Sequence, residues 1–72
     1  MTSSFAVGGV DLDEAGRQLD LAAHDARVAY DCLALGDIER AHIHTITARA
    51  AADAAENTLR VALGEDTTPL AR

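Results

Sequence analysis

The sequence predicts an all-α fold, a long antiparallel helical hairpin, and three observations carry this prediction. Sixteen of the 72 residues are alanine, the residue with the highest helix propensity. Apolar residues recur at alternating spacings of three and four through two long segments, which is a heptad pattern. The Leu35-Gly36-Asp37 turn between these segments is short enough to force them antiparallel. A chain of this length forms one small domain.

The ends of both helices are marked by capping residues. Asp11 is expected to cap the first helix, with Glu14 three residues later, and Gly36 to end it. Asp37 is expected to cap the second helix and Gly64 to end that one. The sequence therefore predicts helices near residues 12–35 and 38–63, within a hairpin domain of residues 11–64. Residues 1–10 are expected to be a flexible lead-in, and residues 65–72 a disordered tail.

The heptad positions predict an alanine-rich seam between the two helices. In the first helix these positions are Leu12, Ala15, Leu19, Ala22, Ala26, Ala29 and Leu33. In the second helix they are Ile38, Ala41, Thr45, Ala48, Ala52, Ala55, Leu59 and Ala62. The turn predicts that residues whose numbers total about 74 face one another. Large side chains then meet alanines near the ends of the hairpin, and alanines meet alanines at its middle.

An alanine seam buries little apolar area, so the hairpin is expected to complete its core by association. Dimerisation into a four-helix bundle is the simplest closure, because a two-fold axis buries the same surface on both copies. Several apolar residues lie off the predicted seam and are the candidate partner-binding residues. They are Leu21, Val28, Cys32, Leu35, Ile43 and Ile46.

Composition excludes several classes of protein and indicates a compartment. Twelve acidic residues against six Arg and no Lys give a net charge of −6, which argues against binding nucleic-acid phosphates. No apolar run is long enough to span a membrane, and the N-terminus lacks the basic start of a signal peptide. The single cysteine, Cys32, cannot form an internal disulfide, so a reducing, cytoplasmic location is expected. Richness in Ala and Arg without Lys is typical of a high-GC bacterium or its phage.

One short motif matches a known metal-binding spacing. Glu39 and His42 form the Glu-x-x-His arrangement of carboxylate-bridged four-helix bundles. Asp31 falls near His42 in the predicted register and is the candidate carboxylate from the other helix. Glu39 also stands in the first helical turn, where a carboxylate serves the helix dipole. A metal site formed by a dimer is therefore kept as an alternative, while no cofactor is expected.

Residues 29–48 resemble the turn of a tetratricopeptide repeat. Ala29, Gly36, Ala41 and Ala48 stand where that repeat places its small residues. The resemblance covers about twenty residues, and it implies a helical-hairpin turn rather than membership of the repeat family. Helical hairpins of the type VII secretion group carry a Trp-x-Gly turn, which this chain lacks.

The sequence thus predicts a small acidic, non-catalytic interaction subunit that docks helix against helix, on itself and on an unidentified protein. Solvated or boundary positions are expected for the three histidines, and no nucleophile has an evident base beside it. No enzymatic activity and no small-molecule substrate are expected. Besides the metal-binding bundle, an acidic DNA mimic or antitoxin-like inhibitor is an alternative. A short linear motif at Phe5 or at residues 67–70 is another.

Overall fold

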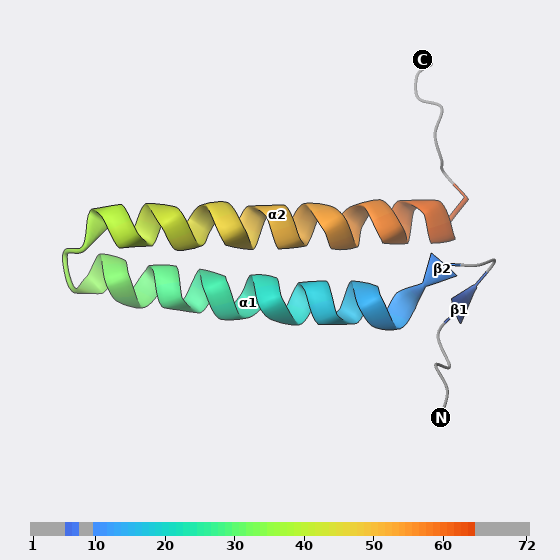
Figure 1. Ribbon diagram of the computed structural model, residues 1–72, viewed down its shortest axis with the longest axis horizontal. Coiled ribbons are helices and arrows are strands. Elements are labelled where there is room, and N and C mark those ends of the chain that lie inside the picture. The colour runs from blue at the N-terminus through green and yellow to red at the C-terminus, as the bar shows by residue number, and fades with distance from the viewer. Residues whose placement is uncertain (1–5, 8–9, 65–72) are drawn as a thin grey trace, which may run out of the picture.

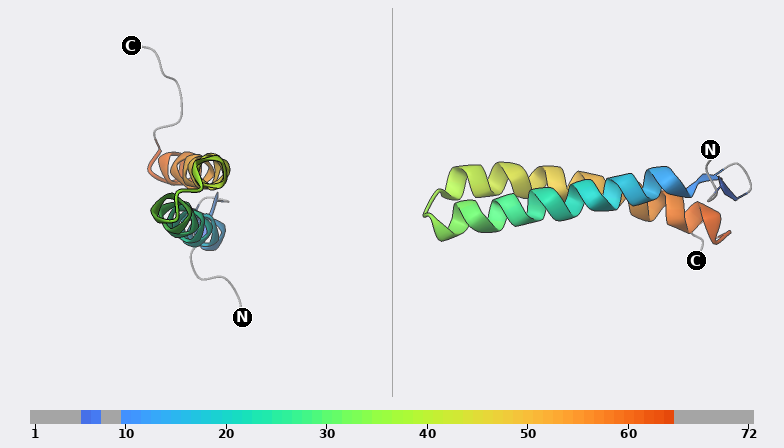
Figure 2. Two further views of the ribbon diagram at one scale, coloured as in Figure 1. Left: turned by 90° about the vertical axis from the view of Figure 1, so that its left-hand side faces the viewer. Right: turned by 90° about the horizontal axis from the view of Figure 1, so that it is seen from below.

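The computed structural model describes residues 6–7 and 10–64 and shows an antiparallel helical hairpin. Helix α1 (Leu12–Ala34) and helix α2 (Ile38–Ala62) run side by side along their whole lengths (Figures 1 and 2). The predicted fold is confirmed, and each helix ends one residue before its predicted end. No helix in residues 6–7 and 10–64 is both long and apolar enough to cross a membrane.

A two-residue antiparallel strand pair precedes α1. Strand β1 (Ala6–Val7) pairs with β2 (Val10–Asp11), with Val7 opposite Val10. The sequence analysis predicts only an irregular lead-in here, although valine favours extended backbone because its branched side chain suits a pleated surface. The rest of the predicted lead-in, residues 1–5 and 8–9, and the predicted tail, residues 65–72, lie outside the described residues.

The helix ends are built by the predicted caps. The Asp11 side chain accepts a hydrogen bond from the backbone N–H of Glu14 at 3.2 Å, and Asp37 accepts one from Arg40 at 3.1 Å. Gly36 adopts φ 83°, which closes α1 in a left-handed conformation that favours glycine. The N–H groups of Gly36 and Asp37 then donate to the carbonyls of Leu33 and Cys32, the paired bonds of a Schellman motif. This local chemistry sets the hairpin turn.

The seam between the helices is rotated relative to the prediction. Ala15, Ala29, Ala41 and Ala55 are buried as predicted. The larger residues predicted beside them are not: Leu19 is 48%, Leu33 57%, Ile38 66% and Leu59 40% exposed. The neighbouring positions face the other helix in their place, and these are Gln18, Asp25, Cys32, His44, Ala51 and Thr58. The hairpin core therefore contains alanines and small polar groups.

A side-chain hydrogen bond joins the two helices. His44 Nδ1 lies 3.0 Å from Asp25 Oδ1, and Asp25 is only 7% exposed. The predicted register places Asp25 opposite Arg49, whereas in the structure its side chain pairs with His44, which is nearer the turn. Rotation of the helices brings Asp25 and His44 to the contact between them, where the two polar groups pair. The same rotation moves Leu19, Leu33 and Leu59 to the edge of that contact.

Candidate functional site

A shallow apolar groove runs along one face of the hairpin, between α1 and α2. Ala29, Ala41 and Ala48 are buried or half-buried residues of the interhelical contact and form part of its lining. Side chains from both helices complete the lining: Ala26, Tyr30, Leu33 and Thr45. The groove exists because alanines at the contact leave the larger flanking side chains standing above them.

Heptad spacing identifies further apolar residues on the groove's side of the hairpin, toward both ends. A spacing of seven residues returns to the same side of a packed helix, so each wall extends in steps of seven. We call the two walls together the groove face; they consist of Leu19, Ala26 and Leu33 on α1 and Ile38, Thr45, Ala52 and Leu59 on α2. These seven residues are all exposed, and none of them is charged.

Thr45 is the single polar residue of the groove face, and its hydroxyl already makes a hydrogen bond within α2. Thr45 Oγ1 donates a hydrogen bond to the backbone carbonyl of Ala41 at 2.8 Å. A hydroxyl bonded within its own helix presents mainly its methyl group to a partner, so burying it costs less than burying an unpaired one. The whole groove face is thus suited to apolar contact.

The edge of the groove carries a cation over an aromatic ring. The Arg27 guanidinium carbon lies 5.5 Å from the centroid of the Tyr30 ring, at a distance that permits a cation–π interaction. Arg27 also pairs with Asp31, with Nε and Oδ1 3.7 Å apart. Charged groups therefore lie at the edge of the groove and leave its walls apolar.

The structure divides the predicted partner-binding residues between two separate strips. Leu21, Val28 and Leu35 are seven residues apart and share one side of α1, with Cys32 half-buried beside them. Ile43 is 55% and Ile46 46% exposed. Successive helical residues turn by about 100°, so both isoleucines lie on the side of α2 away from Ala41, His44 and α1. That these six residues bind a partner stays a prediction.

The metal-ligand candidates do not converge within one chain. The side chain of Asp31 is 60% exposed and pairs with Arg27, and Glu39 and His42 are exposed on α2. In the part of the chain that the structure describes, no three His, Cys, Asp or Glu side chains are close enough to hold a metal ion. A metal site would need ligands from a second copy.

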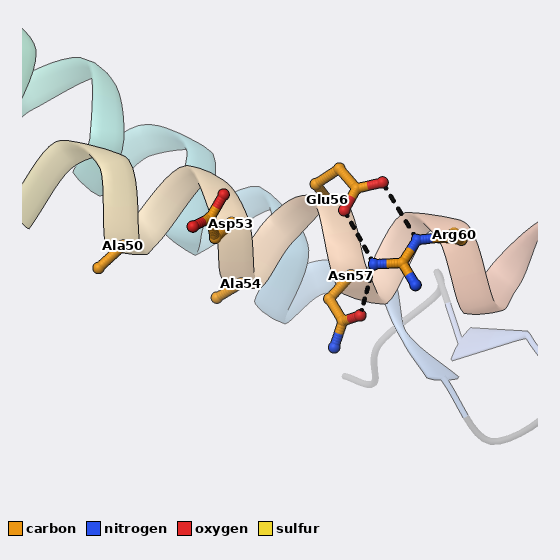
Figure 3. A pocket seen from close by; sticks show the side chains of 6 residues that line it. All are labelled: Ala50, Asp53, Ala54, Glu56, Asn57 and Arg60. Carbon is orange, nitrogen blue, oxygen red and sulfur yellow. Dashed lines mark hydrogen bonds and ion pairs between the residues drawn. The ribbon is translucent and has the colours of Figure 1, made fainter. Parts of the chain in front are cut away.

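A second hollow lies on α2 alone (Figure 3). Its lining comes from a single helix and consists of Ala50, Asp53, Ala54, Glu56, Asn57 and Arg60. Arg60 donates to both Glu56 oxygens, at 3.2 and 3.0 Å, and to Asn57 Oδ1 at 2.8 Å. These hydrogen bonds lower the pKa of the Glu56 carboxyl. Arg60 and Glu56 pair with each other inside the hollow, which therefore resembles an ordinary solvated helix surface.

Sequence reasoning missed the two features that organise the site. The sequence analysis does not predict the Asp25–His44 pair, because polar residues are normally expected on the solvent side of a helix. Its signal was nonetheless present: Asp25 lies three residues from Ala22 and four from Ala29, and His44 is spaced likewise from Ala41 and Ala48. The sequence analysis places the groove face inside the hairpin, because apolar spacing alone does not identify which helix covers it.

Comparison of the chain with protein-family models, curated proteins and solved structures finds no significant match.

Proposed function

We propose that this protein is a small, cytoplasmic, non-catalytic interaction subunit that acts by docking its helices against those of a protein partner. The observation that carries the proposal is the imbalance between what the hairpin buries and what it exposes. Among residues 11–64, the buried apolar residues are five alanines: Ala15, Ala29, Ala41, Ala51 and Ala55. Large apolar side chains line the outside of the same helices.

The energetic consequence of this imbalance follows from side-chain size. Fully burying a Leu or Ile side chain stabilises a fold by about 1.5–3 kcal/mol, whereas an alanine contributes only a fraction of that. No large side chain in the described part of the chain is fully buried. Small domains rarely obtain more than about 3–5 kcal/mol from their own core, and this core is poorer than most. Docking a partner helix on the exposed leucines and isoleucines would supply the missing burial.

Thermal unfolding across protein concentrations tests the proposal. A chain stabilised by association melts at a higher temperature when it is more concentrated, because mass action favours the associated folded state. We expect the circular-dichroism melting temperature of the purified chain to rise between about 2 and 200 μM, or to rise on addition of its partner. A sharp melt of a 7.5 kDa species at one high temperature throughout would show that the hairpin is self-sufficient, and would overturn the proposal.

A further inference from the structure

We infer that the groove face is the docking surface and that its occupant is a second copy of this chain, so that two hairpins close into a four-helix bundle. This inference rests on the proposed function and adds to it the surface and the partner. It also selects a surface other than the Ile43 and Ile46 side of α2.

The first argument is the amount of apolar side chain that the face leaves uncovered. Leu19, Leu33, Ile38 and Leu59 retain between 40% and 66% of their exposure. They alternate along the two helices with the alanines of the interhelical contact. A pair of helices from a partner can therefore pack on the exposed large residues of α1 and α2 together. The same heptad pattern thus serves two contacts, one inside the hairpin and one outside it.

The second argument is charge. Each copy carries a net charge of −6, so two copies repel least when they meet where carboxylates are absent. The groove face meets that requirement, since none of its seven residues is charged. A basic partner would be expected to bind a face that carries carboxylates. The groove face carries none, so its composition does not favour a basic partner.

The third argument is shape. Because the helices are antiparallel, Leu19 and Leu59 lie toward the open end of the groove face, and Leu33 and Ile38 lie at its turn end. Small residues, including Ala26 and Ala52, lie between them. A two-fold axis at the middle of the face, along or across the helices, brings large pairs onto large pairs and the alanine centre onto itself. The order of large and small residues along the face therefore reads alike from either end, so a two-fold axis matches equivalent layers, as an isologous interface requires.

The test compares two double variants of the full chain by sedimentation equilibrium. Leu19→Gln with Leu33→Gln alters the groove face, and Ile43→Gln with Ile46→Gln alters the outer side of α2. The pairs are matched, since the exposures are 48% and 57% in the first and 55% and 46% in the second. Glutamine retains good helix propensity, so neither pair is weakened as a helix. We expect a wild-type dimer, a dissociation constant raised at least about 100-fold by the first pair, and a change within about threefold for the second.

A third variant guards against simple unfolding of the hairpin. Thr45→Val replaces a hydroxyl that is bonded to the Ala41 carbonyl with a methyl group. It should tighten the dimer by roughly 3–10-fold, because it makes an exposed residue fully apolar and that residue becomes buried only in the dimer. Loss of the dimer in the groove variant without tightening by Thr45→Val would overturn the inference, since Leu19 and Leu33 would then act within one hairpin.

The remaining outcomes separate this inference from the proposed function. A wild-type dimer broken by the Ile43 and Ile46 changes, but not by the Leu19 and Leu33 changes, would overturn the groove face and leave an interaction subunit. A wild-type chain that is monomeric and only partly helical would overturn self-docking, and the function would require another partner. A stable monomer whose melt does not depend on concentration would overturn both.

Discussion

Asp25 is the buried charged residue of the described hairpin, and it pairs with half-buried His44 in a seam made mainly of alanine. His44 Nδ1 and Asp25 Oδ1 lie 3.0 Å apart, which is hydrogen-bond distance. Buried polar pairs add little net stability but penalise arrangements that leave them unpaired. The pair thereby helps to fix which sides of α1 and α2 meet, and so which apolar residues remain outside.

Removing the Asp25 carboxylate should weaken the fold. Asp25→Ala is expected to lower the free energy of unfolding by about 1–2 kcal/mol, because His44 is left half-buried without its partner. Asp20→Ala, an exposed aspartate on the same helix, should change it by less than about 0.5 kcal/mol. Urea unfolding at one fixed protein concentration measures both, and equal effects would show that the buried pair contributes nothing.

Glu56 provides a pH prediction at the same scale. Hydrogen bonds from Arg60 lower the pKa of Glu56 in the folded chain. Its contribution to stability is therefore present above the unfolded-state pKa and is lost as the pH falls through the lower, folded-state value. An NMR titration should show the Glu56 carboxyl midpoint below the usual glutamate value, and Arg60→Gln should raise it. An unchanged midpoint in Arg60→Gln would contradict the assigned cause.

At the scale of the helices, the seam depends on residues small enough to let the backbones approach. Ala55 is fully buried, whereas its neighbour Ala54 is exposed. Ala55→Leu should cost about 1–3 kcal/mol by overpacking the seam, and Ala54→Leu should cost less than about 0.5 kcal/mol. Thermal melts at matched concentration measure the difference. Identical melting temperatures would mean that the helices do not pack on Ala55.

Two glycines make opposite contributions to the helices. Gly16 lies inside α1, where an added Cβ would meet nothing within 4 Å, while Gly36 has a positive φ of 83°. Gly16→Ala should raise the stability by about 0.5–1 kcal/mol, since alanine loses less conformational freedom on folding. Gly36→Ala should lower it by about 1–2 kcal/mol, because the left-handed conformation crowds a Cβ. Shifts of the melting temperature in the same direction would contradict this assignment.

The helices could be predicted well from sequence because their signals are local. Asp11, Gly36 and Asp37 act on backbone groups within a few residues, so the helix ends follow from the chain itself. The rotation of the helices could not be predicted in the same way. Ala15 and Ala55 are inward under either rotation, whereas Leu19 and Gln18 compete for the next position. Leucine is the more hydrophobic of the two, which favours Leu19 in the inward position. The contact between Asp25 and His44, which are distant in sequence, favours Gln18 in that position instead.

At the scale of the whole molecule, acidity and apolarity occupy different surfaces. The chain carries its net charge of −6 without placing a charged residue on the groove face. In the proposed dimer, association through this face would have to overcome repulsion between like-charged copies, while the contact itself would be apolar. A DNA mimic would work in the opposite way, because its carboxylates would form the contact. Ionic strength therefore distinguishes the two modes of binding.

Added salt should strengthen self-association of this protein. At about 10 mM ionic strength the Debye length is about 30 Å, and at 0.15 M about 8 Å, so salt screens the repulsion between two acidic hairpins. The dissociation constant of the dimer should fall by severalfold over this range and then level off, because the apolar contact responds only weakly to salt. Sedimentation equilibrium at three salt concentrations measures this trend. Asp53→Asn with Glu56→Gln, which removes two charges outside the groove face, should reduce the salt dependence and tighten the dimer at low salt. A dimer that weakens steadily as salt is added would mean that opposite charges hold it, in which case its contact lies away from the groove face.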